Sequence, residues 1–176
     1  MSLFGKLFGN NPEPVRKASN IINTDWGDFE YLAPQDRRNR FNRSVYEADM
    51  SWTDMDTGSF DDGMVDCVIE CDGDNTTEAQ AGFAMFSAMM SRCGDINYLI
   101  KSTAVQAAGG MNGYVMNDLG VMIPNDIFVS ELCVTCIEVR RDGIMEFTMQ
   151  HETLGKEYLV AVNAQGVVVA AEEKRD

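Results

Sequence analysis

The single histidine and the five cysteines are the side chains best suited to nucleophilic chemistry. The histidine is His151, and the cysteines are Cys67, Cys71, Cys93, Cys133 and Cys136. A catalytic cysteine–histidine pair needs a thiol of lowered pKa that meets the imidazole in space, and no nucleophile motif surrounds His151. One histidine also leaves no partner for a multi-histidine metal site. We interpret His151 as a strand-end residue, hydrogen-bonded or facing solvent, and the odd number of cysteines as reduced thiols of a cytosol-like compartment.

Cys133 and Cys136 have the Cys-x-x-Cys spacing that binds zinc on a knuckle or exchanges disulfides at the start of a helix. Here the pair lies inside an expected strand. Residues three apart on a regular strand point to opposite faces, so one metal ion cannot easily take both thiolates. There is no second Cys-x-x-Cys, and we therefore expect neither zinc nor redox chemistry.

Two acidic segments supply oxygen ligands of the kind that hard cations prefer. The first contains Asp54, Asp56, Asp61 and Asp62, and the second contains Asp72, Asp74, Asn75 and Glu78. Neither is an EF-hand: counted from Asp54, glycine falls at the fifth position, and the twelfth is Val65 instead of glutamate. The second segment is better explained as the cap of the following helix. We expect no metal and no cofactor, with a cation in the acidic loops as an alternative.

The signatures of common enzymes are missing from the sequence. There is no phosphate-binding glycine loop, no Gly-x-Ser-x-Gly elbow and no His-Glu-x-x-His motif. We therefore name no catalytic residue and favour a protein that is not an enzyme.

Charge is distributed unevenly along the chain, whose formal net charge is −14. Eleven acids and no Lys or Arg stand between Val45 and Ser91. Just before them lies the only dense basic cluster, Arg37, Arg38, Arg40 and Arg43, which we interpret as a loop that pairs with nearby carboxylates. An acidic field repels nucleic-acid phosphates and favours a basic protein as partner, so we expect no nucleic acid.

The hydrophobic pattern predicts strands, then two helices, then strands again. The early strands are expected over 26–32, 45–52 and 64–71, because apolar residues alternate there. Asn75 and Glu78 form a capping signal for a helix that ends at Gly94, and Asp95 is placed to cap a second helix that Gly109 stops.

The rest of the chain predicts a loop over 111–125 and strand signal from Ile127 onward. Four strands over 132–140, 144–150, 157–162 and 167–171 are separated by turn sequences and predict an antiparallel meander. Met111, Met116 and Met122 make the expected loop rich in methionine, which suits an adaptable partner surface. The fold class is therefore α+β, a mainly antiparallel sheet with a two-helix hairpin packed on one face.

Domain organisation follows from the length and the first residues. Residues 1–20 are expected to be a flexible N-terminal arm, and residues 21–176 a single α+β domain. No apolar stretch reaches the roughly 20 residues of a membrane-spanning helix, and the start lacks a secretory signal. We expect a cytoplasmic protein with no membrane span, while its oligomeric state stays open.

Three features together resemble small uncharacterised bacterial proteins. They are the aromatic opening Trp26-Gly27-Asp28-Phe29, the acidic strand before the helix over 77–93, and the closing hairpins with Asp142-Gly143 and Leu154-Gly155-Lys156. Some members of this domain-of-unknown-function type occur beside polymorphic toxin systems and look like immunity proteins. The resemblance implies a protein-binding role and carries over no catalytic residue.

The functional hypothesis is a non-enzymatic, immunity-like module that binds a basic protein through an acidic surface. Its candidate partner-binding residues are Asp49, Asp54, Asp56, Asp61, Asp62, Asp66 and Glu70. The alternatives are a cryptic enzyme that uses His151 with a cysteine or the loop carboxylates, a cation-binding protein, and an accessory protein whose acidity serves solubility alone.

Overall fold

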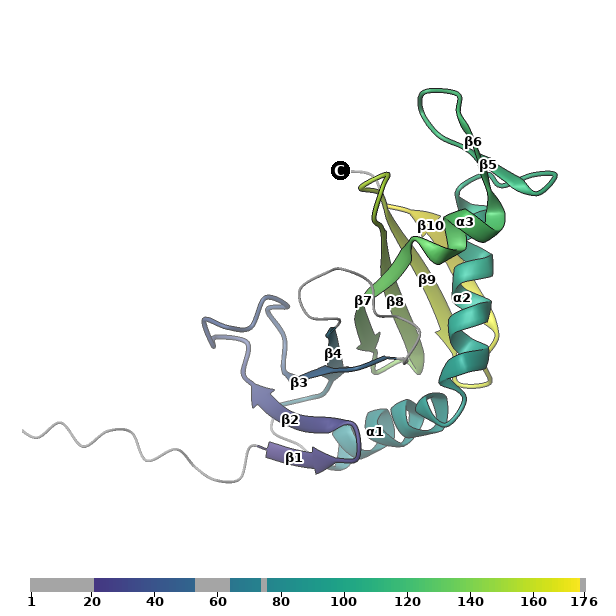
Figure 1. The fold of residues 1–176 in the computed structure, drawn as a ribbon. Coiled ribbons are helices and arrows are strands. Elements are labelled where there is room, and N and C mark those ends of the chain that lie inside the picture. The colour runs from purple at the N-terminus through teal and green to yellow at the C-terminus, as the bar shows by residue number, and fades with distance from the viewer. Residues whose placement is uncertain (1–20, 53–63, 74–75, 175–176) are drawn as a thin grey trace, which may run out of the picture.

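A single eight-stranded sheet forms the body of the molecule (Figure 1). The structure is a computed structural model that describes residues 21–52, 64–73 and 76–174, without the side chains of 76–78. Its elements are β1 (Ile21–Thr24), β2 (Gly27–Leu32), β3 (Val45–Met50), β4 (Val65–Glu70), α1 (Thr76–Met90), α2 (Cys93–Ala107), β5 (Tyr114–Met116), β6 (Met122–Pro124), α3 (Asn125–Ser130), β7 (Leu132–Val139), β8 (Ile144–His151), β9 (Glu157–Asn163) and β10 (Val168–Glu173).

The strand order is β1-β2-β3-β4-β7-β8-β9-β10, and only the contact between β4 and β7 is parallel. All other neighbours in this sheet pair antiparallel, as short hairpin connections require. The parallel pair needs a long crossover, and α1, α2, β5, β6 and α3 together form it. The α+β class, the mainly antiparallel sheet and the closing meander are confirmed.

One face of the sheet carries the core. Phe29, Tyr46 and Ile69 are buried on it, and Phe83 and Phe86 of α1 stack edge-on against Phe29 with ring centroids 5.0 and 5.6 Å apart. Alternation along the strands turns the intervening residues to the opposite face. That face has only a small apolar cluster of Leu32, Val45 and Val68 under Phe41, and we call it the open face.

The two long helices pack on different parts of the core face. α1 contacts β4 and β7, whereas α2 contacts β9 and β10, and the helices meet mainly where one follows the other (Figure 1). The expected packing of a two-helix hairpin is therefore not confirmed. α2 begins at Cys93 after Arg92, so Asp95 lies in its first turn and does not cap it. The proposed cap Asn75 lies outside the described residues.

The prediction of a loop over residues 111–125 is wrong. Asn112 and Gly113 have φ values of 54° and 85°, and Met111 and Tyr114 exchange two backbone hydrogen bonds across them. This two-residue turn closes an isolated bridge just before β5, and the chain then continues into the paired strands β5 and β6, which residues 117–121 connect. α3 then replaces the start of the strand expected at Ile127. No helix within the described ranges is long and apolar enough to cross a membrane.

Gly82 sets the distance between α1 and the sheet. A Cβ atom at this position would lie 2.6 Å from Cγ2 of Ile69, a β-branched side chain that is fully buried and has little room to move. We predict that Gly82→Ala lowers the free energy of unfolding by about 1–3 kcal/mol, although alanine favours helix.

Gly94 supplies the matched control, because it also lies in a helix and a Cβ there meets nothing within 4 Å. Gly94→Ala should be neutral or stabilising by up to about 1 kcal/mol. Chemical denaturation of both variants checks the prediction, and equal effects would contradict it.

Candidate functional site

Carboxylates gather on the open face of the sheet. Asp28, Glu30, Glu47 and Asp49 line a shallow depression of about 350 Å³ on β2 and β3. Asp66 and Glu70 alternate with buried residues on β4 and point the same way, and Glu138 lies on the neighbouring strand β7. Four neighbouring strands thus present acids on one surface.

The strand register places like charges directly opposite each other. Glu30 pairs with Glu47 across β2 and β3, and Asp49 pairs with Asp66 across β3 and β4. Such cross-strand pairs repel and destabilise a sheet unless a cation lies nearby. A compensating group is therefore required on this face.

The arginine loop, Ala33–Ser44, supplies these cations. Arg38 donates to both carboxylate oxygens of Glu30 at 2.8 and 3.0 Å, the paired geometry that holds a carboxylate firmly. Arg40 pairs with Asp66, and Arg43 pairs with Glu138 while its Nε lies 3.8 Å from Glu70. From the sequence we interpret these arginines as partners of nearby carboxylates, and the observed ion pairs agree with that interpretation.

The loop is held in place by its own buried contacts. The amide of Asn39 is buried and donates to the backbone oxygens of Leu32, Ala33 and Arg43 at 3.2, 2.9 and 2.6 Å. Phe41 covers the small apolar cluster of the open face, and the guanidinium groups of Arg40 and Arg43 lie over its ring. The arginines are thus positioned by packing as well as by charge.

Negative charge still exceeds positive charge on this surface. Burial, with nearby Asp66 and Asp49, raises the pKa of Glu47, while Arg40 opposes the shift. Burial also raises the pKa of Glu138, against the influence of Arg43. Both carboxyl groups are therefore in surroundings that disfavour further negative charge.

Three of the seven predicted partner-binding residues, Asp49, Asp66 and Glu70, are brought together on the open face. The other four, Asp54, Asp56, Asp61 and Asp62, lie outside the described residues. In the described part of the chain, no three His, Cys, Asp or Glu side chains are arranged to hold a metal ion.

His151 is buried at the end of β8, on the core face. Its Nδ1 accepts a hydrogen bond from the backbone N–H of Leu154 at 3.3 Å, so the neutral ring carries its proton on Nε2. The ring also stacks on Phe128 with centroids 4.5 Å apart. The interpretation of a hydrogen-bonded strand-end histidine is confirmed, and the solvent-facing option is wrong.

A β-bulge corrects the expected geometry of Cys133 and Cys136. The bulge between Val134 and Cys136 shifts the register, so the two cysteines oppose Gln150 and Thr148, which share the open face. Both thiols therefore lie on the same side of the sheet, opposite to His151, and no cysteine–histidine pair forms there. Burial raises the pKa of Cys136 to about 11, which keeps this thiol protonated and unreactive.

A pocket of about 270 Å³ lies between α1 and the turn after β7, lined by Glu70, Gly82, Met85, Arg140 and Arg141 among others. Its arginines already have carboxylate partners: Arg140 pairs with Glu146 and Asp142, and Arg141 lies 3.6 Å from Asp72. This pocket offers no group arranged for catalysis.

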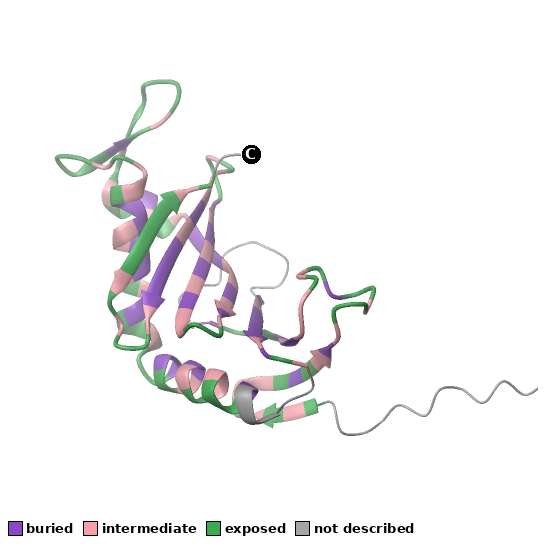
Figure 2. Cartoon of the chain, turned by 180° about the vertical axis from the view of Figure 1, so that it is seen from behind, coloured by how far each residue is buried: buried purple, intermediate pink, exposed green. Residues whose placement is uncertain are grey.

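The hairpin arm, residues 110–124 around β5 and β6, projects from the body and exposes apolar side chains (Figures 1 and 2). The sequence indicated that this segment is rich in methionine but did not predict its strands. Asn112-Gly113 between apolar residues is a sequence typical of two-residue turns, but it marks the turn just before β5, whereas residues 117–121 join β5 to β6.

Comparison with known proteins gave no match: no family model, no curated protein and no solved structure is similar to this chain. The resemblance to immunity-like bacterial proteins stays a prediction.

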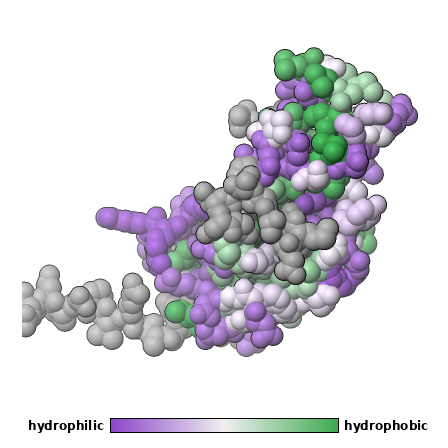
Figure 3. All heavy atoms as spheres, in the orientation of Figure 1, coloured by the Kyte–Doolittle hydropathy of each residue, from purple (hydrophilic) through white to green (hydrophobic). Residues whose placement is uncertain are grey.

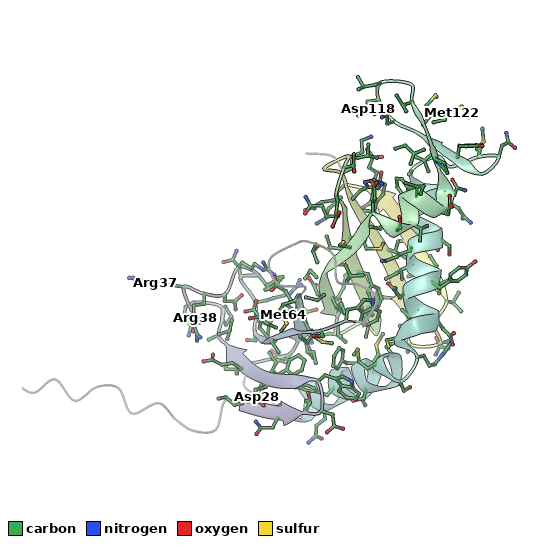
Figure 4. The ribbon with its side chains drawn as sticks, viewed as in Figure 1. Asp28, Arg37, Arg38, Met64, Asp118 and Met122 are labelled. Atoms are coloured by element: carbon green, nitrogen blue, oxygen red, sulfur yellow. The ribbon has the colours of Figure 1, made fainter. Side chains whose placement is uncertain are left out.

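Arg43→Met should destabilise the protein by about 1–2 kcal/mol at neutral pH, because Glu138 and Glu70 lose their shared cation. The loss should shrink as the pH falls toward 4.5, the ordinary glutamate value, since protonated Glu138 needs no partner. Arg37→Met is the control, because this arginine of the same loop points away from the sheet (Figure 4). Urea denaturation at both pH values tests this, and a pH-independent loss would refute it.

The buried histidine predicts a second pH effect. Burial lowers the pKa of His151 below its usual 6.5, so the unfolded chain binds a proton more readily than the folded protein as the pH falls through this value. The free energy of unfolding should therefore fall below about pH 6.5. His151→Gln should show a flatter dependence in the same range. Identical pH profiles for the two proteins would show that His151 does not contribute.

Proposed function

We propose that this protein is a non-enzymatic binding module for a basic partner protein. The observation that carries the proposal is the surplus of carboxylates on the open face. Seven acids of β2, β3, β4 and β7 stand against the three arginines that the loop directs to this face. The seven are Asp28, Glu30, Glu47, Asp49, Asp66, Glu70 and Glu138.

The arrangement supports recognition and not only solubility. Charges that serve solubility need no common surface, whereas these belong to adjacent strands and share one face. Exposed Asp49 stands opposite Asp66, which Arg40 already compensates, so negative charge remains at the surface around Asp49. The acidic field would attract a cationic partner and speed its approach.

The alternative hypothesis, that this protein is an enzyme, has no comparable support among the described residues. The imidazole of His151 is buried on the core face and the Cys133 thiol lies on the open face, so the sheet separates them. An immunity-like role, in which the acidic face occupies the cationic site of a toxin, is consistent with the proposed partner.

The first test is capture of partners from a lysate of the source cells at low and at high salt. We expect a basic protein that is retained at low salt and released at high salt, because salt screens exposed charges. Absence of any salt-sensitive basic partner would reject the proposed function.

The second test locates the surface. Asp49→Lys reverses one exposed charge on the open face, and Asp95→Lys makes the same change on α2, on the helix side of the sheet. With the captured protein purified, Asp49→Lys should lower the association rate and weaken binding by about three- to tenfold, more than Asp95→Lys does. Surface plasmon resonance measures both, and equal effects would mean that only the net charge matters.

A further inference from the structure

Exposed apolar side chains are concentrated on the hairpin arm and the start of α3. Of the twelve large hydrophobic residues exposed in the described ranges, seven lie between Met111 and Ile127. They are Met111, Tyr114, Met116, Leu119, Val121, Met122 and Ile127. Figure 3 shows the corresponding hydrophobic area at the top of the molecule, away from the core. A contiguous apolar area of this kind marks an interaction site more often than a solvated surface.

The strands of the arm are apolar on both faces. Val115 is buried against the body and Ile123 packs beside it, while Tyr114, Met116 and Met122 point outward. Met116 and Met122 are direct cross-strand partners, so their side chains form one outer surface. A strand with one face in water normally carries polar residues there, whereas strands buried on both faces are apolar throughout. The outer face of the arm thus has the composition of a buried surface.

A second turn of the same protein shows that the turn itself does not require an apolar tip. In Asn117–Val121 the side chain of Asn117 accepts hydrogen bonds from the backbone N–H groups of Leu119 and Val121. Asn163 makes the same two bonds to Gln165 and Val167 in the turn between β9 and β10. The residue equivalent to Leu119 is therefore the polar Gln165.

Leu119 is 88% exposed at this tip. Since an identical turn is built with glutamine, the leucine does not serve the turn, and its exposure opposes the hydrophobic effect. It has the position and chemistry of an anchor that enters a pocket on another molecule.

The arm is held in a defined position before any partner binds. Val115 lies in the main core, the backbone N–H of Asn125 donates to Gly113 at 2.9 Å, and Lys156 pairs with Asp118 at 3.0 Å. Figure 4 shows Asp118 and Met122 on the projecting hairpin. An ordered anchor loses little conformational entropy on binding, which favours affinity.

Charge around the arm identifies the kind of partner. No Lys or Arg occurs between Ser102 and Val139, whereas Asp118, Asp126 and Glu131 do. The nearby Lys156 already pairs with Asp118 and Glu173. A second copy of this chain or an anionic membrane would bring negative charge against this border, while a basic protein would complement it.

We infer that the hairpin arm is the apolar anchor of the basic-protein interface, with Leu119 entering an apolar pocket bordered by Lys or Arg of the partner. This inference rests on the proposed function and adds a second contact surface to it. The open face would then attract the partner electrostatically, and the arm, at the other end of the molecule from Asp28, would add an apolar contact (Figure 4).

The test begins with photo-crosslinking in the full chain. The protein carrying benzoylphenylalanine at position 119 is incubated with a lysate of the source cells and irradiated. The same probe at position 165 is the matched control. We expect position 119 to crosslink to a basic protein at an apolar peptide next to Lys or Arg, and position 165 to give no such product. A crosslink to another copy of the chain, to lipid, or to no molecule at all would overturn the inference.

Binding measurements then separate the inference from the proposed function. With the crosslinked protein purified, Leu119→Gln should weaken binding about tenfold or more, and Gln165→Ala by less than about twofold. Circular dichroism and thermal unfolding should be unchanged, because both side chains are exposed. If Leu119→Gln binds a salt-sensitive basic partner as the unmodified protein does, the inference fails while the proposed function stands. If no such partner exists, the proposed function itself fails.

Discussion

Side chains from one face of the sheet pack against α1 and α2. This contact fixes the side of the sheet to which the alternating residues of each strand point. Phe29 lies under Phe83 and Phe86, and Gly82 allows α1 to approach Ile69 closely. Because neighbouring residues of a strand point to opposite faces, burying this set turns the acidic set outward. The charged surface is thus a direct consequence of how the core is formed.

That constraint creates the repulsion that the arginine loop relieves. Glu30 opposes Glu47 and Asp49 opposes Asp66, and arginines from one connection lie beside both pairs. The same connection contributes Phe41 to the open face, so part of the sheet is shielded and part stays accessible. Charge compensation within the chain and the proposed attraction to a cationic partner would therefore act on the same surface.

Among the described residues, one of the two apolar faces of the hairpin arm is exposed. On β8, by contrast, the outward residues are polar: Glu146, Thr148 and Gln150 alternate with buried Met145 and Phe147. The arm combines a fixed base at Val115 with an exposed tip at Leu119. The arm lies at the other end of the molecule from β2 and the arginine loop, so the proposed partner would have to contact two separate surfaces (Figure 4).

The sequence by itself determined the α+β class, most strand and helix positions, and the acidic character, because alternation, turn residues and net charge are local or additive properties. It also predicted that the arginines of residues 37–43 meet carboxylates. It missed β5 and β6, since strands of three residues give almost no periodicity. Cys133 and Cys136 lie on the same side of the sheet because of a bulge. The bulge forms in the pairing with β8, and no local sequence pattern predicts it. Only the tertiary structure decided that Asp49 faces Asp66 and that Leu119 is exposed among the described residues, because register and exposure depend on residues distant in the chain.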